Sequence, residues 1–136
     1  MVEISTDPSR LDVDLVHRFL SEEAYWAIGR PRALTERAIA HSLCFGAYAD
    51  DGGQVAFARV VTDHALFAYL ADVFVLAAVR GRGVGKQLVG AIMAHADVRA
   101  VRRVLLATDD AHGLYAQFGF TPLADAEAWM GIRRTP

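Results

Sequence analysis

The residues Asp72–Leu88 read DVFVLAAVRGRGVGKQL, and the rest of the chain is organised around this stretch. A strand-like apolar run leads into a turn with glycine at every second position, Gly81 to Gly85, and a helix-like run begins at Lys86. Glycines let backbone N–H groups approach a ligand closely, and the N-terminus of a helix adds partial positive charge. The turn also carries three basic side chains, Arg80, Arg82 and Lys86. The stretch therefore predicts a pocket for a phosphorylated ligand at a strand–loop–helix junction.

Two common phosphate-binding loops do not fit this turn. A Walker loop would need glycine where Arg80 stands and a hydroxyl where Gln87 stands. The dinucleotide fingerprint, started from Gly83, would need glycine in place of Leu88. A Walker-type nucleotide site and a Rossmann dinucleotide site are therefore both disfavoured.

A third pattern, Arg/Gln-x-x-Gly-x-Gly/Ala, does match residues 80–85, which read RGRGVG. A second pattern, Ala-x-x-Leu-Tyr-x-x-x-Gly-Phe, matches Ala111–Phe120, which reads AHGLYAQFGF. With both motifs in this order, the chain resembles the GCN5-related N-acetyltransferase (GNAT) family from about Leu43 to Phe120. The resemblance implies an N-acetyltransferase, an acyltransferase of the EC 2.3.1 class, that uses acetyl-CoA as co-substrate and needs no metal. An acyl-CoA-binding module that senses without turnover is the alternative.

The resemblance also implies roles for individual residues. Tyr115 would donate a proton to the departing thiolate. Thr108 stands where the family often has an asparagine that contacts the cofactor. The implied cofactor-binding residues are Val73, Phe74, Val75, Arg80, Gly81, Arg82, Gly83, Val84, Gly85, Lys86 and Thr108.

The acceptor side is less defined. The loop Ser21–Pro31, SEEAYWAIGRP, has aromatic residues beside carboxylates, which either cover the core or line an acceptor pocket. Candidate bases or acceptor contacts are Glu22, Glu23, Tyr25, Trp26, Tyr69, Asp110 and His112, and Asp63, His64 and Asp72 are further candidate bases. Period-two alternation places Tyr69 on the strand face of Val73 and Val75, and Asp72 on the opposite face unless a bulge intervenes. The resemblance implies a small-molecule or peptide amine as acceptor, and the sequence does not decide which of these residues is the base.

The expected fold is a mixed α+β or α/β architecture. It has a central mixed, mostly antiparallel GNAT-like sheet of about six to seven strands, flanked by about four helices. The expected strands are Val2–Ser5, Leu43–Ala49, Gln54–Val61, Phe67–Val75, Val104–Ala107 and Ala128–Ile132, with a brief strand or turn at Phe120–Leu123. The expected helices are Asp12–Ser21, Thr35–His41, the helix that starts at Lys86 and ends at His95, and Gly113–Phe118. We expect three consecutive strands to form a meander, and the strands before and after the glycine loop to pair in parallel.

Length, composition and charge limit the possible classes of protein. The 136 residues suit one domain, 1–136, and at 54% hydrophobic and 22% charged they can form a full core. The net charge of −2 argues against a nucleic-acid binder. The one cysteine, Cys44, lies in an apolar run and is expected to be buried and unreactive. With no apolar run of membrane-spanning length and no signal-peptide core, a cytoplasmic protein with no membrane partner is expected, and the family resemblance makes a homodimer reasonable.

Overall fold

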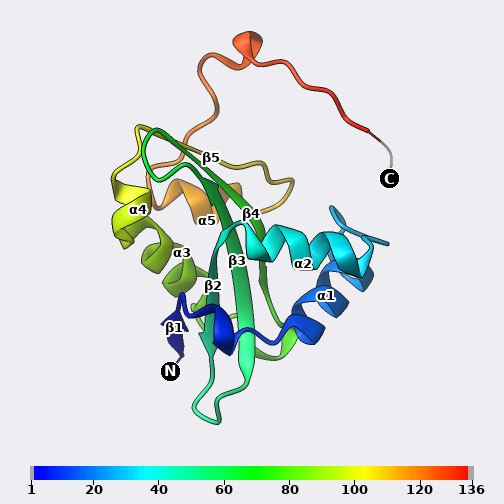
Figure 1. Ribbon diagram of the computed structural model, residues 1–136. Helices are drawn as coiled ribbons and strands as arrows, with labels where there is room; N and C mark the ends of the chain where they lie inside the picture. Colours follow the sequence, from blue (N-terminus) through cyan, green and yellow to red (C-terminus); the bar gives the residue numbers. More distant parts are fainter. Residues whose placement is uncertain (1, 135–136) are drawn as a thin grey trace.

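The computed structural model of the chain describes residues 2–134, in which five strands form one sheet in the order β1-β2-β3-β4-β5 (Figure 1). The strands are β1 Glu3–Ser5, β2 Leu43–Tyr48, β3 Gln54–Thr62, β4 Phe67–Val75 and β5 Arg103–Leu105. The pairs from β1 to β4 are antiparallel, and β4 pairs with β5 in parallel. The meander and the parallel crossover pair are confirmed. The expectation of about six to seven strands needs correction, because the described residues form five.

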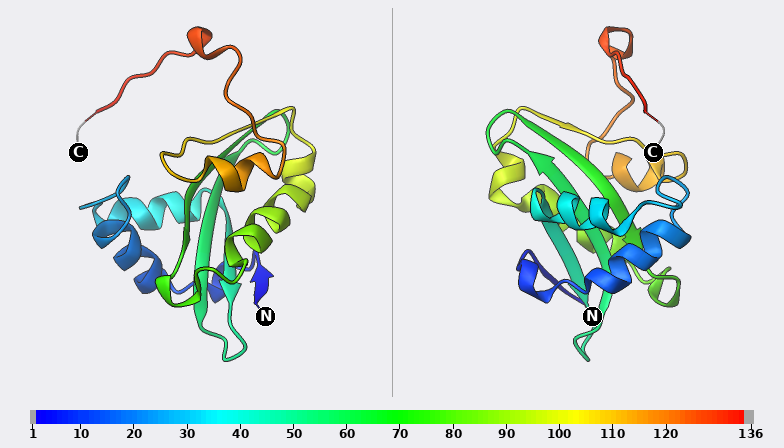
Figure 2. Two further views of the ribbon diagram at one scale, coloured as in Figure 1. Left: turned by 180° about the vertical axis from the view of Figure 1, so that it is seen from behind. Right: turned by 45° about the vertical axis from the view of Figure 1, so that its right-hand side comes forward.

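Helices cover both faces of the sheet. They are α1 Val13–Glu22, α2 Arg32–Ala40, α3 Val84–Ala94, α4 Ala96–Arg99 and α5 His112–Ala116, with 3-10 turns at Pro8–Arg10, Ala77–Val79 and Ala126–Ala128. Figure 2 shows α1 and α2 on one face, and α3, α4 and α5 on the other. Each face has its own core, because successive side chains of a strand point to opposite sides. One core joins β2, β3 and β4 to α3, and the other joins the sheet to α1 through Val16, Phe19 and Leu20.

Strand β4 breaks this alternation at Asp72. The pairing with β3 runs from Ala71 opposite Arg59 to Phe74 opposite Phe57, so two residues of β4 face one of β3. Asp72 has a φ of 54°, in the left-handed region that Asp and Asn tolerate better than other non-glycine residues. This geometry is that of a β-bulge, which redirects a side chain locally.

The bulge reverses the face on which the later residues of β4 lie. Leu70 and, beyond the bulge, Val73 and Val75 pack in the core on the α3 side, whereas Phe74 packs on the α1 side. The expected common face of Tyr69, Val73 and Val75 is therefore wrong, because strict period-two alternation does not pass through a bulge.

Two helices start earlier than expected. α2 begins at Arg32 rather than Thr35, because Pro31 acts as its N-cap with φ −62°, a value suited to starting a helix. α3 begins at Val84 rather than Lys86, immediately after Gly83 in the left-handed conformation. The first helix, which starts after its N-cap Asp12, lies where the sequence predicts it.

The C-terminal segment departs furthest from expectation. The predicted strand Ala128–Ile132 is not formed; residues 121–134 are all exposed, and their one regular element is the 3-10 turn Ala126–Ala128. Figure 1 shows it extending away from the sheet. Nor does Phe120–Leu123 form a strand. No helix within residues 2–134 has the length and apolar character needed to cross a membrane.

Candidate active site

The glycine loop between β4 and α3 has the open backbone that an anion site requires. Gly81 and Gly83 have φ of 79° and 78°, and a Cβ atom placed on either would meet no atom within 4 Å apart from the adjacent residues of the chain. Gly83 is the N-cap of α3 and offers no side-chain acceptor to the first N–H groups of the helix. These N–H groups have no intrahelical partner, so they can bind an anion such as a pyrophosphate.

A cavity of about 560 Å³ runs from this loop to Tyr115. Its walls include Val73, Phe74 and Val75 of β4, the loop residues Arg80, Gly81, Gly83, Val84 and Gly85, and Glu23. The parallel ladder between β4 and β5 stops at Tyr69 opposite Leu105, so within residues 2–134 no strand pairs with the later part of β4 on that side. Backbone groups of β4 beyond the ladder can therefore contact a ligand in this cavity.

The basic residues of the loop differ in position. Arg80 lines the cavity, and its Nε donates to the Val75 carbonyl oxygen at 3.0 Å, which ties the loop to the end of β4. Arg82 lines a separate cavity beside the β2–β3 turn, and Lys86 is exposed on α3. The structure therefore brings Arg80 to the cavity wall, whereas Arg82 and Lys86 are outside the residues that line it.

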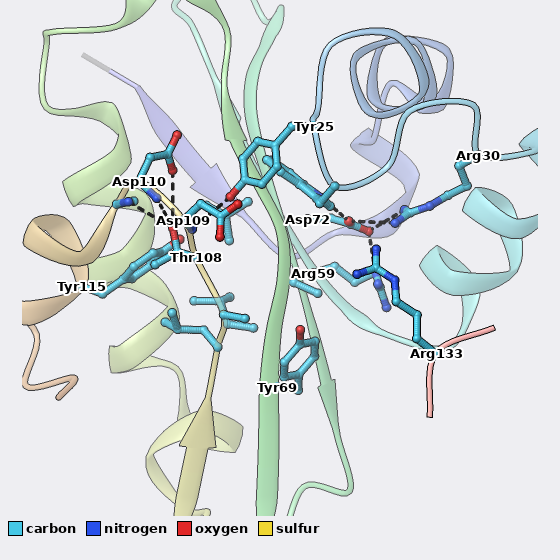
Figure 3. Close-up of a pocket in the computed structure, with 17 residues that line it drawn as sticks. Tyr25, Arg30, Arg59, Tyr69, Asp72, Thr108, Asp109, Asp110, Tyr115 and Arg133 are labelled. Atoms are coloured by element: carbon cyan, nitrogen blue, oxygen red, sulfur yellow. Dashed lines mark hydrogen bonds and ion pairs between the residues drawn. The ribbon is translucent and has the colours of Figure 1, made fainter. Parts of the chain in front are cut away.

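A second cavity, of about 580 Å³, opens on the other side of Tyr115 (Figure 3). The two cavities share six residues, Tyr25, Trp26, Val73, Asp110, Ala111 and Tyr115. The second cavity is also lined by Tyr69, Asp72, Thr108 and Asp109 and by the arginines Arg30, Arg59 and Arg133. A ligand in each cavity would therefore meet the other beside Tyr115.

Asp72 holds the loop before α2 against the sheet. Its carboxylate accepts hydrogen bonds from Trp26 Nε1 at 2.9 Å, Arg30 Nη1 at 2.8 Å and Arg59 Nε at 3.0 Å. Burial alone would raise the pKa of Asp72, but the hydrogen bond from Arg30 and the charges of Arg59 and Arg30 outweigh it and leave the pKa lowered. A carboxylate held in this way orients its neighbours and is a poor proton acceptor.

Tyr115 is the buried titratable group where the cavities meet. It is 7% exposed and packs edge-on against Phe120 at 5.9 Å between ring centroids. Burial, followed by the nearby Asp110 carboxylate and Tyr25, raises the pKa of Tyr115 to about 12. The phenol therefore keeps its proton at neutral pH and can donate it.

Tyr25 and Trp26 close the site from the α1–α2 side. Their rings pack edge to face with centroids 4.9 Å apart, and the Tyr25 hydroxyl accepts a hydrogen bond from the Asp109 backbone N–H at 3.1 Å. They line both cavities and are 52% and 38% exposed. The structure thus favours the pocket-lining interpretation of these aromatics over the covering of a core.

Several sequence candidates lie elsewhere. Glu22 is exposed at the end of α1, and His112 lines a groove beside β5. Thr108 lines the second cavity, and its hydroxyl accepts from the Ala111 N–H at 3.1 Å, so it shapes the start of α5. Asp63 accepts three backbone N–H bonds in the β3–β4 turn, and His64 pairs with Asp97 at 3.0 Å on the surface.

Two further side chains, those of Cys44 and His95, lie apart from the residues that line the two cavities. Cys44 is 6% exposed, and burial raises the pKa of its thiol to about 11, as expected for an unreactive cysteine. His95, which follows the last residue of α3, is half-buried with its ring edge-on to Phe45 at 5.6 Å between ring centroids. Within residues 2–134 no cluster of three or more His, Cys, Asp or Glu side chains could hold a metal.

Sequence reasoning missed Arg30, Arg59 and Asp109. Arg59 lies in the middle of an apolar strand, and a charge there signals a buried partner. Arg30 and Asp109 carry no such signal, because arginine and aspartate are ordinary loop residues.

Comparison with known proteins agrees with this geometry. The acetyltransferase (GNAT) domain family matches residues 40–122. A Gibberella zeae protein that bears the name acetyltransferase is 30% identical over 95% of this chain and 84% of its own length. A crystal structure from Xanthomonas campestris pv. campestris, described as belonging to the GNAT family, is 56% identical, with a TM-score of 0.94 over 100% of this chain and 94% of that one. A Clostridium acetobutylicum structure solved with acetyl-CoA shares the fold, at 15% identity and a TM-score of 0.72 over 98% and 96% of the two chains. The chain therefore belongs to the GNAT family of acetyltransferases.

Proposed function

We propose that this protein transfers the acetyl group of acetyl-CoA to a primary amine of a small molecule or peptide by direct attack on the thioester. The observation that carries the proposal is that two cavities meet at one buried, protonated tyrosine, Tyr115. Acetyl-CoA supplies the activated acyl group. The protein positions the two reactants and provides a proton donor and a proton acceptor.

The cofactor side fits the cavity lined by the glycine loop. The uncapped N–H groups at the start of α3 would hold the pyrophosphate, together with Arg80 at the cavity wall. Val73–Val75, beyond the end of the β4–β5 ladder, would lie along the thioester-bearing arm. Backbone N–H groups there can polarise a carbonyl.

The acceptor side fits the cavity that contains Asp72. Two arginines already occupy that carboxylate, so we assign proton removal to Asp110, which borders both cavities. Asp110 would take the proton of the incoming ammonium, directly or through water. Tyr25 and Trp26 would form the wall against which the acceptor packs.

The reaction then balances in one displacement. The amine nitrogen bonds to the acyl carbon while the carbon–sulfur bond breaks. Asp110 first releases the ammonium proton to water. Tyr115 then gives its hydroxyl proton to the departing sulfur, and the second proton, which the nitrogen loses as the amide forms, restores the Tyr115 hydroxyl through water. Holding both reactants in adjoining cavities supplies much of the remaining acceleration.

The test is thiol release from acetyl-CoA with a panel of primary amines, comparing the natural chain with Tyr115→Phe. We expect kcat to fall by at least about 100-fold with little change in acetyl-CoA affinity. The control is Tyr48→Phe, because Tyr48 is a tyrosine of similar burial on β2 that lines neither cavity. Unchanged kcat in Tyr115→Phe would refute the assigned role. Tight acetyl-CoA binding without turnover of any amine would instead favour a sensor.

A further inference from the structure

The cavity that contains Asp72 is lined by groups of opposite charge at its two ends (Figure 3). One end lies beside Tyr115 and is lined by Asp109 and Asp110. The other end is lined by three arginines. A small ligand that spans the cavity would therefore meet negative charge close to Tyr115 and positive charge at the far end.

Two of the arginines are held in place by Asp72. Arg30 binds the carboxylate through both Nη1 at 2.8 Å and Nη2 at 3.2 Å, and Arg59 Nε donates to it at 3.0 Å. Two guanidinium groups on one carboxylate leave one positive charge in excess. Arg59 Nη1 donates to Ser42 Oγ at 3.2 Å, and no group of residues 2–134 accepts a hydrogen bond from Arg59 Nη2. Arg59 is therefore fixed in position at the cavity wall and keeps a donor for the oxygen of a ligand.

Arg133 adds a further positive charge at the same end. It lines the cavity from the C-terminal segment, and it forms no ion pair with a carboxylate of residues 2–134. The three arginines of this end thus face a single carboxylate, that of Asp72. Guanidinium groups bind carboxylates and phosphates through paired hydrogen bonds, so this end of the cavity suits an anionic group of a ligand.

An aromatic wall joins the two ends of the cavity. Trp26 Nε1 donates to the Asp72 carboxylate at 2.9 Å, and the Tyr25 hydroxyl accepts from the Asp109 backbone N–H at 3.1 Å. The two rings lie 4.9 Å apart between centroids, so the wall runs from the arginines to the acidic end. A cavity of about 580 Å³ suits a small molecule, and an aromatic wall suits the carbon chain or ring between its two polar ends.

We propose that the acceptor is a small primary amine that also carries an anionic group, a carboxylate or a phosphate, at the end away from the amine. This inference rests on the proposed function and narrows the class of acceptor given there. The ammonium group lies beside Asp109 and Asp110, and the anionic group binds Arg59 and Arg133. An amine without an anionic group, such as a lysine side chain in a neutral peptide, leaves these arginines without a counter-ion and binds less tightly.

The first test compares acceptors in pairs that differ in the anionic group. The pairs are ω-amino acids from glycine to ε-aminocaproate, each with its own amide, and phosphoethanolamine with ethanolamine. The series of lengths samples the span between the two ends of the cavity, and the two kinds of pair distinguish a carboxylate from a phosphate. With saturating acetyl-CoA we expect kcat/KM to be at least about tenfold higher for the anionic member of the pair whose length fits.

The second test replaces Arg133, because Arg30 and Arg59 also hold Asp72 and their loss would disturb the fold. Arg133 is exposed, so Arg133→Gln should fold as the natural chain does, as circular dichroism would show. We expect KM for the preferred anionic acceptor to rise about fivefold, with kcat, KM for the matching amide and acetyl-CoA affinity unchanged. The matched control is Arg134→Gln, which removes the same charge from the adjacent residue, one that does not line the cavity, and should leave every value unchanged.

A third measurement, calorimetric binding of the same pairs to the protein saturated with coenzyme A, separates this inference from the proposed function. Equal kcat/KM within every pair would overturn the inference and leave acetyl transfer standing. A preference that Arg133→Gln leaves intact, or that Arg134→Gln reduces as much, would also overturn it. Selective binding of anionic amines without turnover of any amine would refute acetyl transfer and keep the cavity as a site for an anionic amine. Neither turnover nor binding of any compound would overturn both.

Discussion

Replacing Asp72 with asparagine removes one negative charge from a buried group and leaves its shape in place. The carboxylate is 3% exposed, and its partners Arg30 and Arg59 are 21% and 15% exposed. Asparagine tolerates the left-handed backbone that this position adopts, with φ 54°, so the substitution adds little backbone strain. The measured effect is then that of the charge.

The expected loss in the free energy of unfolding follows from the contacts. Removing one partner of a buried ion pair costs about 3–5 kcal/mol, because a buried charge is left uncompensated. Arg30 and Arg59 retain some contact with water, and the asparagine oxygen can still accept one hydrogen bond. We therefore expect a loss of about 3 kcal/mol, a large fraction of the roughly 5–15 kcal/mol that stabilises a typical domain.

The assay is denaturant unfolding at several pH values, with Asp14→Asn as control. Asp14 pairs with Arg32 at 2.8 Å but is 81% exposed, so its loss should cost less than about 1 kcal/mol. Because the pKa of Asp72 is lowered in the folded state, its stabilisation is present above the ordinary value of 3.8 and is lost as the pH falls through the folded value. The gap between the natural chain and Asp72→Asn should be constant near neutrality and close below about pH 4.

Two results would refute this reasoning. An Asp72→Asn chain as stable as the natural one at neutral pH would mean that the two arginines need no counter-ion. A gap that widened on acidification would mean that the pKa of Asp72 is raised rather than lowered.

Two further predictions concern the glycine loop and the cysteine. Gly83→Val should weaken acetyl-CoA binding at least about tenfold, as measured by calorimetry. The left-handed conformation at the N-cap of α3 costs residues other than glycine roughly 1–2 kcal/mol, so the loop must shift. An unchanged affinity would mean that the loop is not part of the cofactor site. Burial raises the pKa of the Cys44 thiol to about 11. At pH 8 the thiol should therefore react with a thiol reagent only as fast as local or global unfolding exposes it. Rapid labelling of the folded protein would contradict its burial.

The features that could be predicted from the sequence were those that depend on residues close together along the chain. Alternation and turn residues located the meander, and the RGRGVG turn located the junction of β4 and α3, because glycine spacing and helix starts are short-range signals. The Ala111–Phe120 motif placed Tyr115 on a short helix facing the glycine loop.

What the sequence could not predict depended on partners far along the chain. Arg30 and Arg59 stabilise the bulge at Asp72, and the sequence of β4 alone does not indicate that a bulge forms there. For the same reason the sequence did not identify Arg59 and Asp109 as members of the acceptor cavity, although Tyr25, Trp26, Tyr69 and Asp110, which also line it, were candidates. The predicted strand at Ala128–Ile132 has the pattern of a strand, but a strand also needs a neighbour, and residues 2–134 of one chain supply none.

The bulge at Asp72 also bears on how a mutational scan of this protein should be interpreted. Its backbone conformation favours glycine, asparagine and aspartate, while its two arginines demand an acid, and aspartate alone satisfies both conditions. A saturation library selected for activity would therefore recover almost only aspartate at this position. Such intolerance is usually taken as the mark of a reacting group, yet here it would come from a residue that only positions its neighbours.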